Sequence, residues 1–323
     1  MNKITYLVTG SFGFIGSHVV TELLKNPHNI IINVDNLGVG SDPKNVPISE
    51  RLINYYINIC DESIFEIFET HRPDYIVHLA AESHVDRSIS NPLSFVESNV
   101  NGTANILEGM RRFVPNARMV HVSTDEVYGH LEIDDEPFTE ETPIDARSPY
   151  SASKAASDML ALAYRTTYKL DITVTRCCNN YGEHQHDEKL IPTIIRSIVN
   201  GDKIPVYGKG DNIREWIYVK DHAKSVLEVL HHFSRRRIYN LYGTERYRNL
   251  DLIKKIIDEL VETYPIYKRG SHEDYIMFVA DRKGHDFKYA MSSIHDEITT
   301  LHRQESFTQA ITKTINYYVS KYA

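Results

Sequence analysis

The sequence predicts an α/β fold, in which a doubly wound parallel sheet is followed by a smaller α/β C-terminal lobe. In the first half of the chain, short apolar runs alternate with helical patterns, and strands separated by helices of this kind pair in parallel under helices on both faces. After Arg176 the alternation stops, and glycine and proline interrupt the chain more often. The 323 residues suffice for a substantial core and for two such parts.

The expected elements follow one another in a regular order. Strands are expected at residues 4–9, 29–34, 75–79, 118–122 and 172–175, and another strand is expected to end at Asn58-Ile59. Helices are expected at residues 17–25, 64–70, 94–112, 150–168, 250–263 and 306–318. Residues 216–219 and 238–241 are expected to return to the main sheet. The expected domains are therefore residues 1–181 with about 215–241, and residues 182–214 with 242–323.

Composition narrows the class of protein. The net charge of −8 argues against broad electrostatic binding to nucleic acid or to acidic membranes. No apolar run approaches the length of a membrane span, and a strand is expected almost from the first residue, without a signal peptide. The neighbouring Cys177 and Cys178 would point to opposite faces of a strand and would not pair with each other. We therefore expect a cytoplasmic protein in a reducing compartment.

The first expected strand runs into a glycine-rich turn, TGSFGFIG. Gly10, Gly13 and Gly16 permit close approach of the backbone to a ligand, and the helix that follows presents unpaired N–H groups to a pyrophosphate. Asp35 ends the second strand, where a carboxylate accepts hydrogen bonds from a ribose diol and repels the 2′-phosphate of NADP, with Asn36 beside it. A tight turn alone would explain the glycines, but the whole order of elements is typical of a Rossmann-type NAD-binding domain.

Two further segments are expected to contact NAD. Asn58 and Ile59 lie near the expected adenine position, and Leu79, Ala80 and Ala81 end a strand with small residues that let the backbone approach the cofactor. Both assignments depend on the expected fold.

Tyr150 and Lys154 lie one helical turn apart on one face of an expected helix. A nearby ammonium group stabilises a phenolate, so we expect Lys154 to lower the pKa of Tyr150 and make it a base for dehydrogenation. The spacing alone is a weak signal, because it recurs at Tyr264/Lys268 and Tyr317/Lys321, where surface residues are the simpler interpretation. The first pair differs by following the strand that leads into STDEVYG.

Asp125 and Glu126 come directly after this apolar strand. Solvated loop acids are the ordinary alternative, but ligands of such sheets bind at the carboxyl edge, where this pair is expected. A simple dehydrogenase has no need for an acid and a base beside its tyrosine. The pair therefore indicates that the redox step serves another reaction.

The chain resembles the extended short-chain dehydrogenase/reductase family, and within it the nucleotide-sugar 4,6-dehydratases. The resemblance covers residues 7 to about 290 and depends on the segments TGSFGFIG, HLAAESHVDRS, STDEVYG, YSASK, NNYG, EKLIP, PVYG and DRKGH. The glycines and the Tyr/Lys pair are common to the whole family. The Thr-Asp-Glu triplet is typical of the dehydratases and is lacking in the related epimerases and decarboxylases.

The resemblance implies a three-stage reaction on a nucleoside-diphosphate glucose. Tyr150 would remove the C4 hydroxyl proton while hydride passes to NAD, and Thr124 would hydrogen-bond the C4 oxygen. Glu126 would take the C5 proton, and Asp125 would protonate the departing C6 hydroxyl. Hydride would then return to C6, with Lys154 positioning the nicotinamide ribose. To act as an acid Asp125 must be protonated, and burial beside a second carboxylate raises its pKa.

The resemblance also implies a set of ligand-binding residues. Those implied for the cofactor are Phe14, Ile15, Ser83, Ser98 and Asn180. Those implied for the nucleotide sugar are Ser83, Thr124, Asn179, Lys189, Leu190, Pro205, Val206, Tyr207, Arg214, Asn249, Asp281, Arg282 and His285. A guanidinium such as that of Arg214 suits a diphosphate. The alternative for each is a surface or packing residue, and a core role is the simplest interpretation of Leu190 and Val206.

Several alternatives stay open at this stage. Asn58 stands where the family usually has Asp, although an amide oxygen can still accept a bond from adenine. His184 and His186 lack a third ligand nearby, so no metal is expected. A dTDP-glucose substrate is favoured over UDP-glucose; less favoured are a UDP-sugar epimerase or decarboxylase and an NAD sensor without turnover. The resemblance implies a homodimer formed by helices near residues 94–112 and 150–168.

Overall fold

The computed structural model describes residues 3–232, 236–281, 286–295 and 305–323 and confirms the predicted α/β class. A seven-stranded parallel sheet has the order β10-β6-β5-β4-β1-β2-β3. Its strands are β1 (Ile4–Thr9), β2 (Asn29–Val34), β3 (Leu52–Tyr55), β4 (Tyr75–His78), β5 (Arg118–Thr124), β6 (Asp171–Cys177) and β10 (Ile238–Leu241). The strand order reverses between β1 and β4, which opens a crevice at their carboxyl ends.

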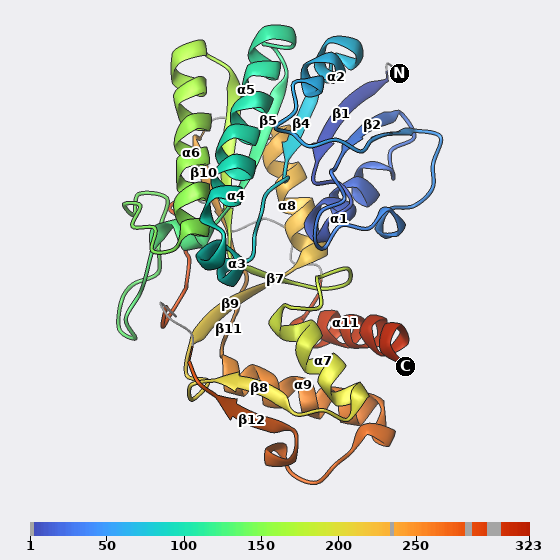
Figure 1. Ribbon diagram of the computed structural model, residues 1–323, viewed down its shortest axis with the longest axis vertical. Coiled ribbons are helices and arrows are strands. Elements are labelled where there is room, and N and C mark those ends of the chain that lie inside the picture. Colours follow the sequence, from blue (N-terminus) through green and yellow to red (C-terminus); the bar gives the residue numbers. More distant parts are fainter. Residues whose placement is uncertain (1–2, 233–235, 282–285, 296–304) are drawn as a thin grey trace.

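Helices cover both faces of this sheet (Figure 1). Tyr6 and Val8 of β1 face α1 (Phe14–Leu23) and α8 (Val219–His232), whereas Leu7 faces the opposite layer. That layer contains α2 (Ser63–His71), α5 (Gly102–Phe113) and α6 (Pro149–Tyr168). Alternate residues of each strand are therefore buried on opposite faces, as expected for a parallel sheet enclosed by helices.

The helix expected at residues 94–112 is interrupted. Beyond α3 (Val85–Ser90), the chain forms α4 (Pro92–Val96), a π-helical turn at Glu97–Asn101 and then α5. Within this turn Asn99 is fully buried; its Nδ2 donates to Glu82 O (3.0 Å) and to Ser153 Oγ (2.8 Å), and its Oδ1 accepts from Glu82 N (2.8 Å). The turn therefore fixes the segment after β4 against α6 and brings Ser98 to the ligand pocket.

The smaller part of the molecule lies below the sheet in Figure 1. Strands β7 (Asn179–Tyr181), β9 (Ile213–Tyr218) and β11 (Glu245–Arg248) form a three-stranded sheet between the two parts, and β8 (Ile204–Tyr207) pairs with β12 (Ile276–Val279). Three helices, α7 (Leu190–Asn200), α9 (Asn249–Thr263) and α11 (Phe307–Tyr322), pack around a separate apolar core. Ile194, Ile256 and Ile315 are among its fully buried residues.

Several expected boundaries were wrong. Residues 216–219 do not return to the main sheet, because Trp216 pairs with Asn179 and Glu245 in the three-stranded sheet and α8 begins at Val219. Residues 238–241 do return, as β10 beside β6. The strand expected to end at Asn58-Ile59 ends at Tyr55.

The first helix begins at Phe14 and not at Ser17. Gly13 is its N-cap residue with extended backbone, so the glycine turn and the helix follow each other without a gap. In the described part of the chain, no helix is both long and apolar enough to cross a membrane.

Candidate active site

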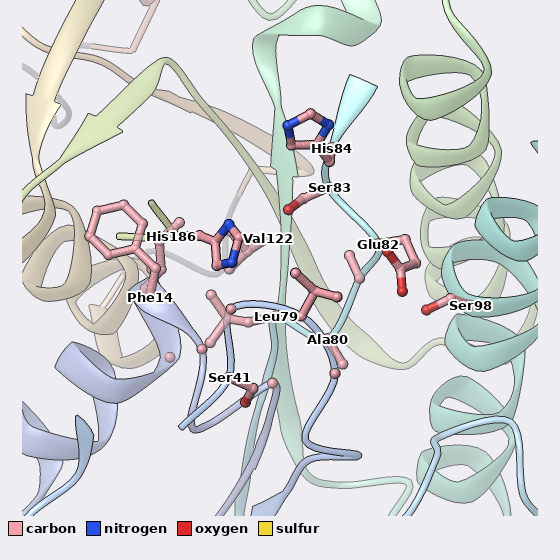
Figure 2. Close-up of a pocket in the computed structure, with 18 of the residues that line it drawn as sticks. Phe14, Ser41, Leu79, Ala80, Glu82, Ser83, His84, Ser98, Val122 and His186 are labelled. Carbon is pink, nitrogen blue, oxygen red and sulfur yellow. The ribbon is translucent and has the colours of Figure 1, made fainter. Parts of the chain in front are cut away.

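A cavity of about 340 Å³ opens at the carboxyl edge of the main sheet. Figure 2 shows its walls, with His186 beside Phe14 at one side and Glu82 and Ser98 at the other. The cavity brings together every predicted catalytic and cofactor-binding residue: Gly10, Gly13, Phe14, Ile15, Gly16, Asp35, Asn36, Asn58, Ile59, Leu79, Ala80, Ala81, Ser83, Ser98, Thr124, Asp125, Glu126, Tyr150, Lys154 and Asn180.

The glycine turn has space for a ligand but none for side chains. Gly10 has φ +68°, and a Cβ added there would lie 2.8 Å from Ala80 N. A Cβ on Gly16 would lie 2.0 Å from Gly10 O. Because the backbone approaches itself so closely, the turn and the first N–H groups of α1 form a bare cradle of donors. This cradle fits the pyrophosphate of a dinucleotide.

Asp35 is oriented for the ribose diol by its neighbours. Its Oδ2 accepts from Phe12 N (3.0 Å), and its Oδ1 accepts from Leu37 N (2.8 Å) and Ser41 Oγ (2.7 Å). The side chain is 5% exposed. These bonds leave a lone pair on Oδ2 for a ribose hydroxyl, and the carboxylate would repel a 2′-phosphate, so the site fits NAD.

The segments expected beside the cofactor are held by side chains from neighbouring strands and helices. Thr9 Oγ1 accepts hydrogen bonds from Leu79 N and Ala80 N, both at 3.2 Å, which draws the end of β4 against the glycine turn. Asn105 Nδ2 donates to Ile59 O at 3.0 Å. Asn58 Oδ1 already accepts from the backbone N–H of residue 60 at 3.0 Å, so its carbonyl has one lone pair left for adenine.

Thr124, Asp125 and Glu126 lie where β5 passes into a 3₁₀ turn. Thr124 Oγ1 accepts from Glu126 N (3.3 Å) and donates to Asp125 Oδ1 (3.2 Å). Asp125 is 2% exposed, and its Oδ2 has no hydrogen-bond partner among the described residues. Burial raises the pKa of Asp125 well above its usual value, and the nearby Glu126 and Glu215 raise it further. This shift favours the protonated form of Asp125, which is the form that an acid needs.

Tyr150 and Lys154 lie on the first turns of α6, whose N-terminus is fixed by a Ser148–Ser151 capping box. Lys154 Nζ donates to Val122 O at 2.9 Å. Burial raises the pKa of Tyr150 well above its usual value, with Glu126 adding to the rise. The expected lowering of this pKa by Lys154 is wrong as a net effect in this structure, because desolvation of the phenolate dominates.

A buried polar layer supports this face of the sheet, and sequence reasoning missed it. Arg176 Nε of β6 lies 3.0 Å from Asp158 Oδ2 of α6, and His121 Nε2 of β5 lies 3.4 Å from Asp158 Oδ1. Burial lowers the pKa of Lys154, and the negative charge of Asp158 opposes that shift. One signal was present in the sequence, since Asp158 follows Lys154 by four residues on the same helix.

The predicted sugar-nucleotide residues divide into two groups. Ser83, Thr124, Asn179 and Lys189 line the cavity, and Lys189 Nζ donates to Ser83 O at 3.3 Å. Others lie in the smaller part, outside the cavity lining: Leu190, Pro205, Val206, Tyr207, Arg214, Asn249 and Asp281. Arg282 and His285 lie outside the described residues.

The Arg214 guanidinium contacts backbone oxygens on both sides of the gap in the described residues at 282–285. Its guanidinium donates to Ile213 O (2.8 Å), Phe287 O (3.2 Å) and Asp286 O (2.8 Å), and it lies 4.4 Å from the centroid of the Tyr289 ring. These contacts brace the end of β9. A diphosphate-binding role for Arg214 stays a prediction.

A core role was the simplest interpretation of Leu190 and Val206. Val206 is 2% exposed and belongs to the apolar core of the smaller part, and Leu190 packs against that core. Tyr207 is 46% exposed at the end of β8 and has room to contact a ligand.

Sequence reasoning did not assign other residues of the cavity: Val34, Gly38, Val39, Gly40, Ser41, Ile57, Glu82, His84, Arg87, Val122, Ser123, Cys177, Cys178, Gln185, His186 and Glu188. Cys177 and Cys178 are buried and, like Cys60, free. The described residues contain no group of three or more His, Cys, Asp or Glu that could hold a metal ion. His184 instead hydrogen-bonds Ser17 Oγ through Nδ1 (3.1 Å) and stacks on His18.

Comparison with known proteins identifies the family. Residues 6–241 match the NAD dependent epimerase/dehydratase family. The chain belongs to this family. The predicted extended short-chain dehydrogenase/reductase fold is thereby confirmed.

Within this family, the chain is similar to dTDP-glucose 4,6-dehydratases. It is 42% identical to dTDP-glucose 4,6-dehydratase 1 of Escherichia coli K12, over 97% of this chain and 92% of that protein. It is 39% identical to the dTDP-glucose 4,6-dehydratase of Haemophilus influenzae, over 97% of each chain.

Solved structures of related proteins have the same fold. The dTDP-glucose 4,6-dehydratase DesIV of Streptomyces venezuelae, with NAD and dTDP bound, superimposes with a TM-score of 0.89 at 39% identity, over 98% of this chain and 97% of that one. UDP-glucose 4-epimerase of Thermotoga maritima has a TM-score of 0.87, over 99% of this chain and 100% of that one, but only 24% identity, which shows the shared fold alone.

Proposed function

We propose that the protein catalyses the NAD-dependent dehydration of dTDP-glucose to the 4-keto-6-deoxy sugar nucleotide, as a hydro-lyase. The observation that carries the proposal is the buried carboxyl pair Asp125–Glu126 in the same cavity as Tyr150 and Lys154. A sugar oxidation needs one proton acceptor, whereas removing water from C5 and C6 needs a base and an acid as well. The cavity holds all three groups.

Each group has a distinct role in the proposed reaction. Oxidised NAD, when bound, supplies the hydride acceptor and donor and a positive ring that favours the Tyr150 phenolate. Tyr150 takes the proton of the C4 hydroxyl, and Thr124 hydrogen-bonds the C4 oxygen. Glu126 takes the C5 proton, which the neighbouring C4 ketone has acidified. Asp125 gives its proton to the C6 hydroxyl as water leaves.

The electrostatics of Asp125 and Glu126 support the assignment of Asp125 as the acid and Glu126 as the base. The pKa of Asp125 is raised by burial first and by the Glu126 charge second, which favours the protonated form of Asp125 and suits it to the role of acid. Two adjacent carboxyl groups in different environments thus become an acid and a base. Thr124 strengthens the arrangement, because its hydroxyl hydrogen-bonds both Asp125 and the Glu126 backbone.

The glycine cradle, Asp35 and Lys154 would hold NAD, and the division of the chain follows from this. We assign cofactor binding to residues 1–181 with about 215–241, and sugar-nucleotide binding to residues 182–214 with 242–323. The similarity to dTDP-glucose enzymes at 39–42% identity favours dTDP-glucose over UDP-glucose.

The decisive experiment incubates the purified protein with dTDP-glucose or UDP-glucose and follows the 4-keto-6-deoxy product by mass spectrometry. We expect product from dTDP-glucose at the higher kcat/KM. Formation of a C4 epimer in place of the keto product would support the epimerase alternative and contradict the roles of Asp125 and Glu126. No chemical change in either substrate would favour an NAD-binding protein without turnover.

We also propose a cytoplasmic homodimer. Ile89, Leu93 and Val96 of α3 and α4 are 51%, 76% and 45% exposed, and Met159 of α6 is 55% exposed. Apolar side chains gathered on neighbouring helices are typical of an interface. Light scattering after size-exclusion chromatography tests this proposal, and a monomer at micromolar concentration would contradict it.

A further inference from the structure

We propose that residues 184–188, called the strap below, close the NAD-binding cavity and slow release of the cofactor. The inference rests on the proposed function in one respect: an enzyme that takes hydride and returns it to the same substrate gains from keeping its NAD between turnovers. The sequence HQHDE of the strap has no role in the reaction described above.

The strap lies at the cavity, between the two parts of the protein. It precedes α7 of the smaller part, and Gln185, His186 and Glu188 all line the cavity. Figure 2 shows the His186 side chain at the same side of the pocket as Phe14, the first residue of α1. The strap therefore faces the expected path of the dinucleotide.

An ion pair connects the strap to the opposite wall. Arg87 of α3 belongs to the larger part, and its Nη2 lies 2.7 Å from Glu188 Oε1 and 2.8 Å from Oε2. His84 Nε2 lies 3.5 Å from Glu188 Oε2, and His186 Nδ1 lies 3.4 Å from the same oxygen. All four residues line the cavity, and the Arg87–Glu188 pair joins α3 to the strap there.

The strap also lies near the loop that follows Asp35. Gly40 has no side chain, and a Cβ built there would come to ordinary van der Waals distance of His186, 3.4 Å from its Cβ and 3.5 Å from its Cδ2. Gly40 and Ser41 line the cavity, and Ser41 Oγ donates to Asp35. The strap thus contacts α3 and lies near the loop beside the expected ribose site.

The side of the strap away from α3 is held by α11. Tyr318 OH of α11 donates to Gln185 O at 2.5 Å. Asp187 Oδ1 accepts from Lys321 Nζ (2.8 Å) and from Tyr322 OH (2.6 Å). Gln185 and Asp187 are thus held by α11, and His184 is held against α1 by Ser17 and His18. The Arg87–Glu188 pair joins the remaining end of the strap to α3.

The Arg87–Glu188 pair, called the latch below, is exposed to solvent, as expected of an ion pair that breaks and re-forms often. The Arg87 and Glu188 side chains are 34% and 42% exposed, so water and salt weaken their attraction, and the gain from closure is small. We expect the loss of such a pair to speed NAD release about threefold to tenfold.

The test measures NAD release without any sugar nucleotide. Protein carrying radiolabelled NAD is mixed with excess unlabelled NAD, and retained label is followed over time. Arg87→Met, Glu188→Gln and the double variant are compared with wild type and with Glu22→Gln. The last breaks an exposed Glu22–Lys25 pair on α1 that does not cross the cavity. Circular dichroism and the thermal midpoint show that each variant is folded.

We expect Arg87→Met and Glu188→Gln each to release NAD about threefold to tenfold faster than wild type. Glu22→Gln should release NAD at the wild-type rate. The double variant should be no faster than either single variant, because the two side chains act as one pair. Release rates within twofold of wild type would overturn the proposal, as would single effects that multiply in the double variant. Absence of a dehydration product, with faster release in the latch variants, would contradict the proposed reaction and leave the strap standing.

Discussion

Replacing Asp158 by Asn tests the buried layer beneath the active site. Asp158 Oδ2 lies 3.0 Å from Arg176 Nε, and the two side chains are 0% and 2% exposed. His121 faces the same carboxylate, and Lys154 precedes it by one helical turn. Asp158 therefore compensates two buried cations on this face of the sheet, Arg176 and Lys154, the second of which belongs to the proposed catalytic pair.

The loss of stability expected in Asp158→Asn follows from the burial of the Asp158–Arg176 ion pair. Removing one partner of a buried ion pair destabilises a protein by about 3–5 kcal/mol, because the remaining charge stays buried without compensation. Asn keeps one oxygen that can still accept from Arg176, so we expect a loss near the lower end, about 3 kcal/mol. Denaturation by urea at pH 7, followed by circular dichroism, measures this loss.

The same variant should alter catalysis in a direction set by charge. Burial lowers the pKa of Lys154, and the Asp158 carboxylate opposes that shift. Arg176 and the neutral His121 do not replace this negative charge. In Asp158→Asn the pKa of Lys154 therefore falls further, and the lysine loses its proton at a lower pH. We expect the alkaline limb of the kcat/KM profile for dTDP-glucose to move to lower pH.

Asp171→Asn provides a matched control. Asp171 Oδ2 lies 3.6 Å from Arg118 Nε and its Oδ1 lies 3.7 Å from Arg165 Nη1, but the Asp171 side chain is 43% exposed. This change should cost less than about 1 kcal/mol and leave the pH profile unaltered. The reasoning is refuted if Asp158→Asn costs no more than Asp171→Asn, or if the alkaline limb does not move.

Three other predictions concern the cavity itself. Glu126→Gln should lower turnover at least about 100-fold while dTDP-glucose still slowly reduces bound NAD, seen as NADH absorbance; unchanged turnover would remove Glu126 from its role. Asp125→Asn, which has no acidic proton to give, should lower product formation about 100-fold or more, and a smaller effect at all pH values would contradict an acid at this position. Gly10→Ala should weaken NAD binding at least about tenfold by calorimetry, because its Cβ would lie 2.8 Å from Ala80 N at φ +68°. Gly201→Ala, with φ +82° and its nearest contact at 4.0 Å, is strained but should bind NAD normally, and equal losses in both variants would contradict the close-approach argument.

Much of the cavity was predictable because parallel strands bring their carboxyl ends to one edge. Once β1, β2, β4 and β5 are recognised, the residues that follow them must meet, and this placed the glycine turn, Asp35, Ala80 and Asp125 together. The spacing of Tyr150 and Lys154 correctly predicted that their side chains lie together, because residues four apart share one face of a helix.

Misplaced elements were those whose structure depends on distant partners. Trp216 has the pattern of a core strand, but its pairing with Asn179 and Glu245 decided which sheet it joined. The π-helical turn at Glu97–Asn101 interrupts a continuous helical pattern, and Asn99 there bonds Glu82 and Ser153. The periodicity of a local stretch of sequence carries no information about such long-range contacts.

The sequence by itself therefore determined the fold class and, through its motifs, the family, and it predicted the NAD cradle and the proposed acid and base, because each motif lies within one strand, turn or helix. Only the tertiary structure decided the electrostatics, since the pKa of Asp125, Tyr150 and Lys154 depends on how fully the rest of the chain excludes water. It alone also joined Arg87 to Glu188, which lie 101 residues apart in the chain. Contacts of that range are set by the packing of whole domains.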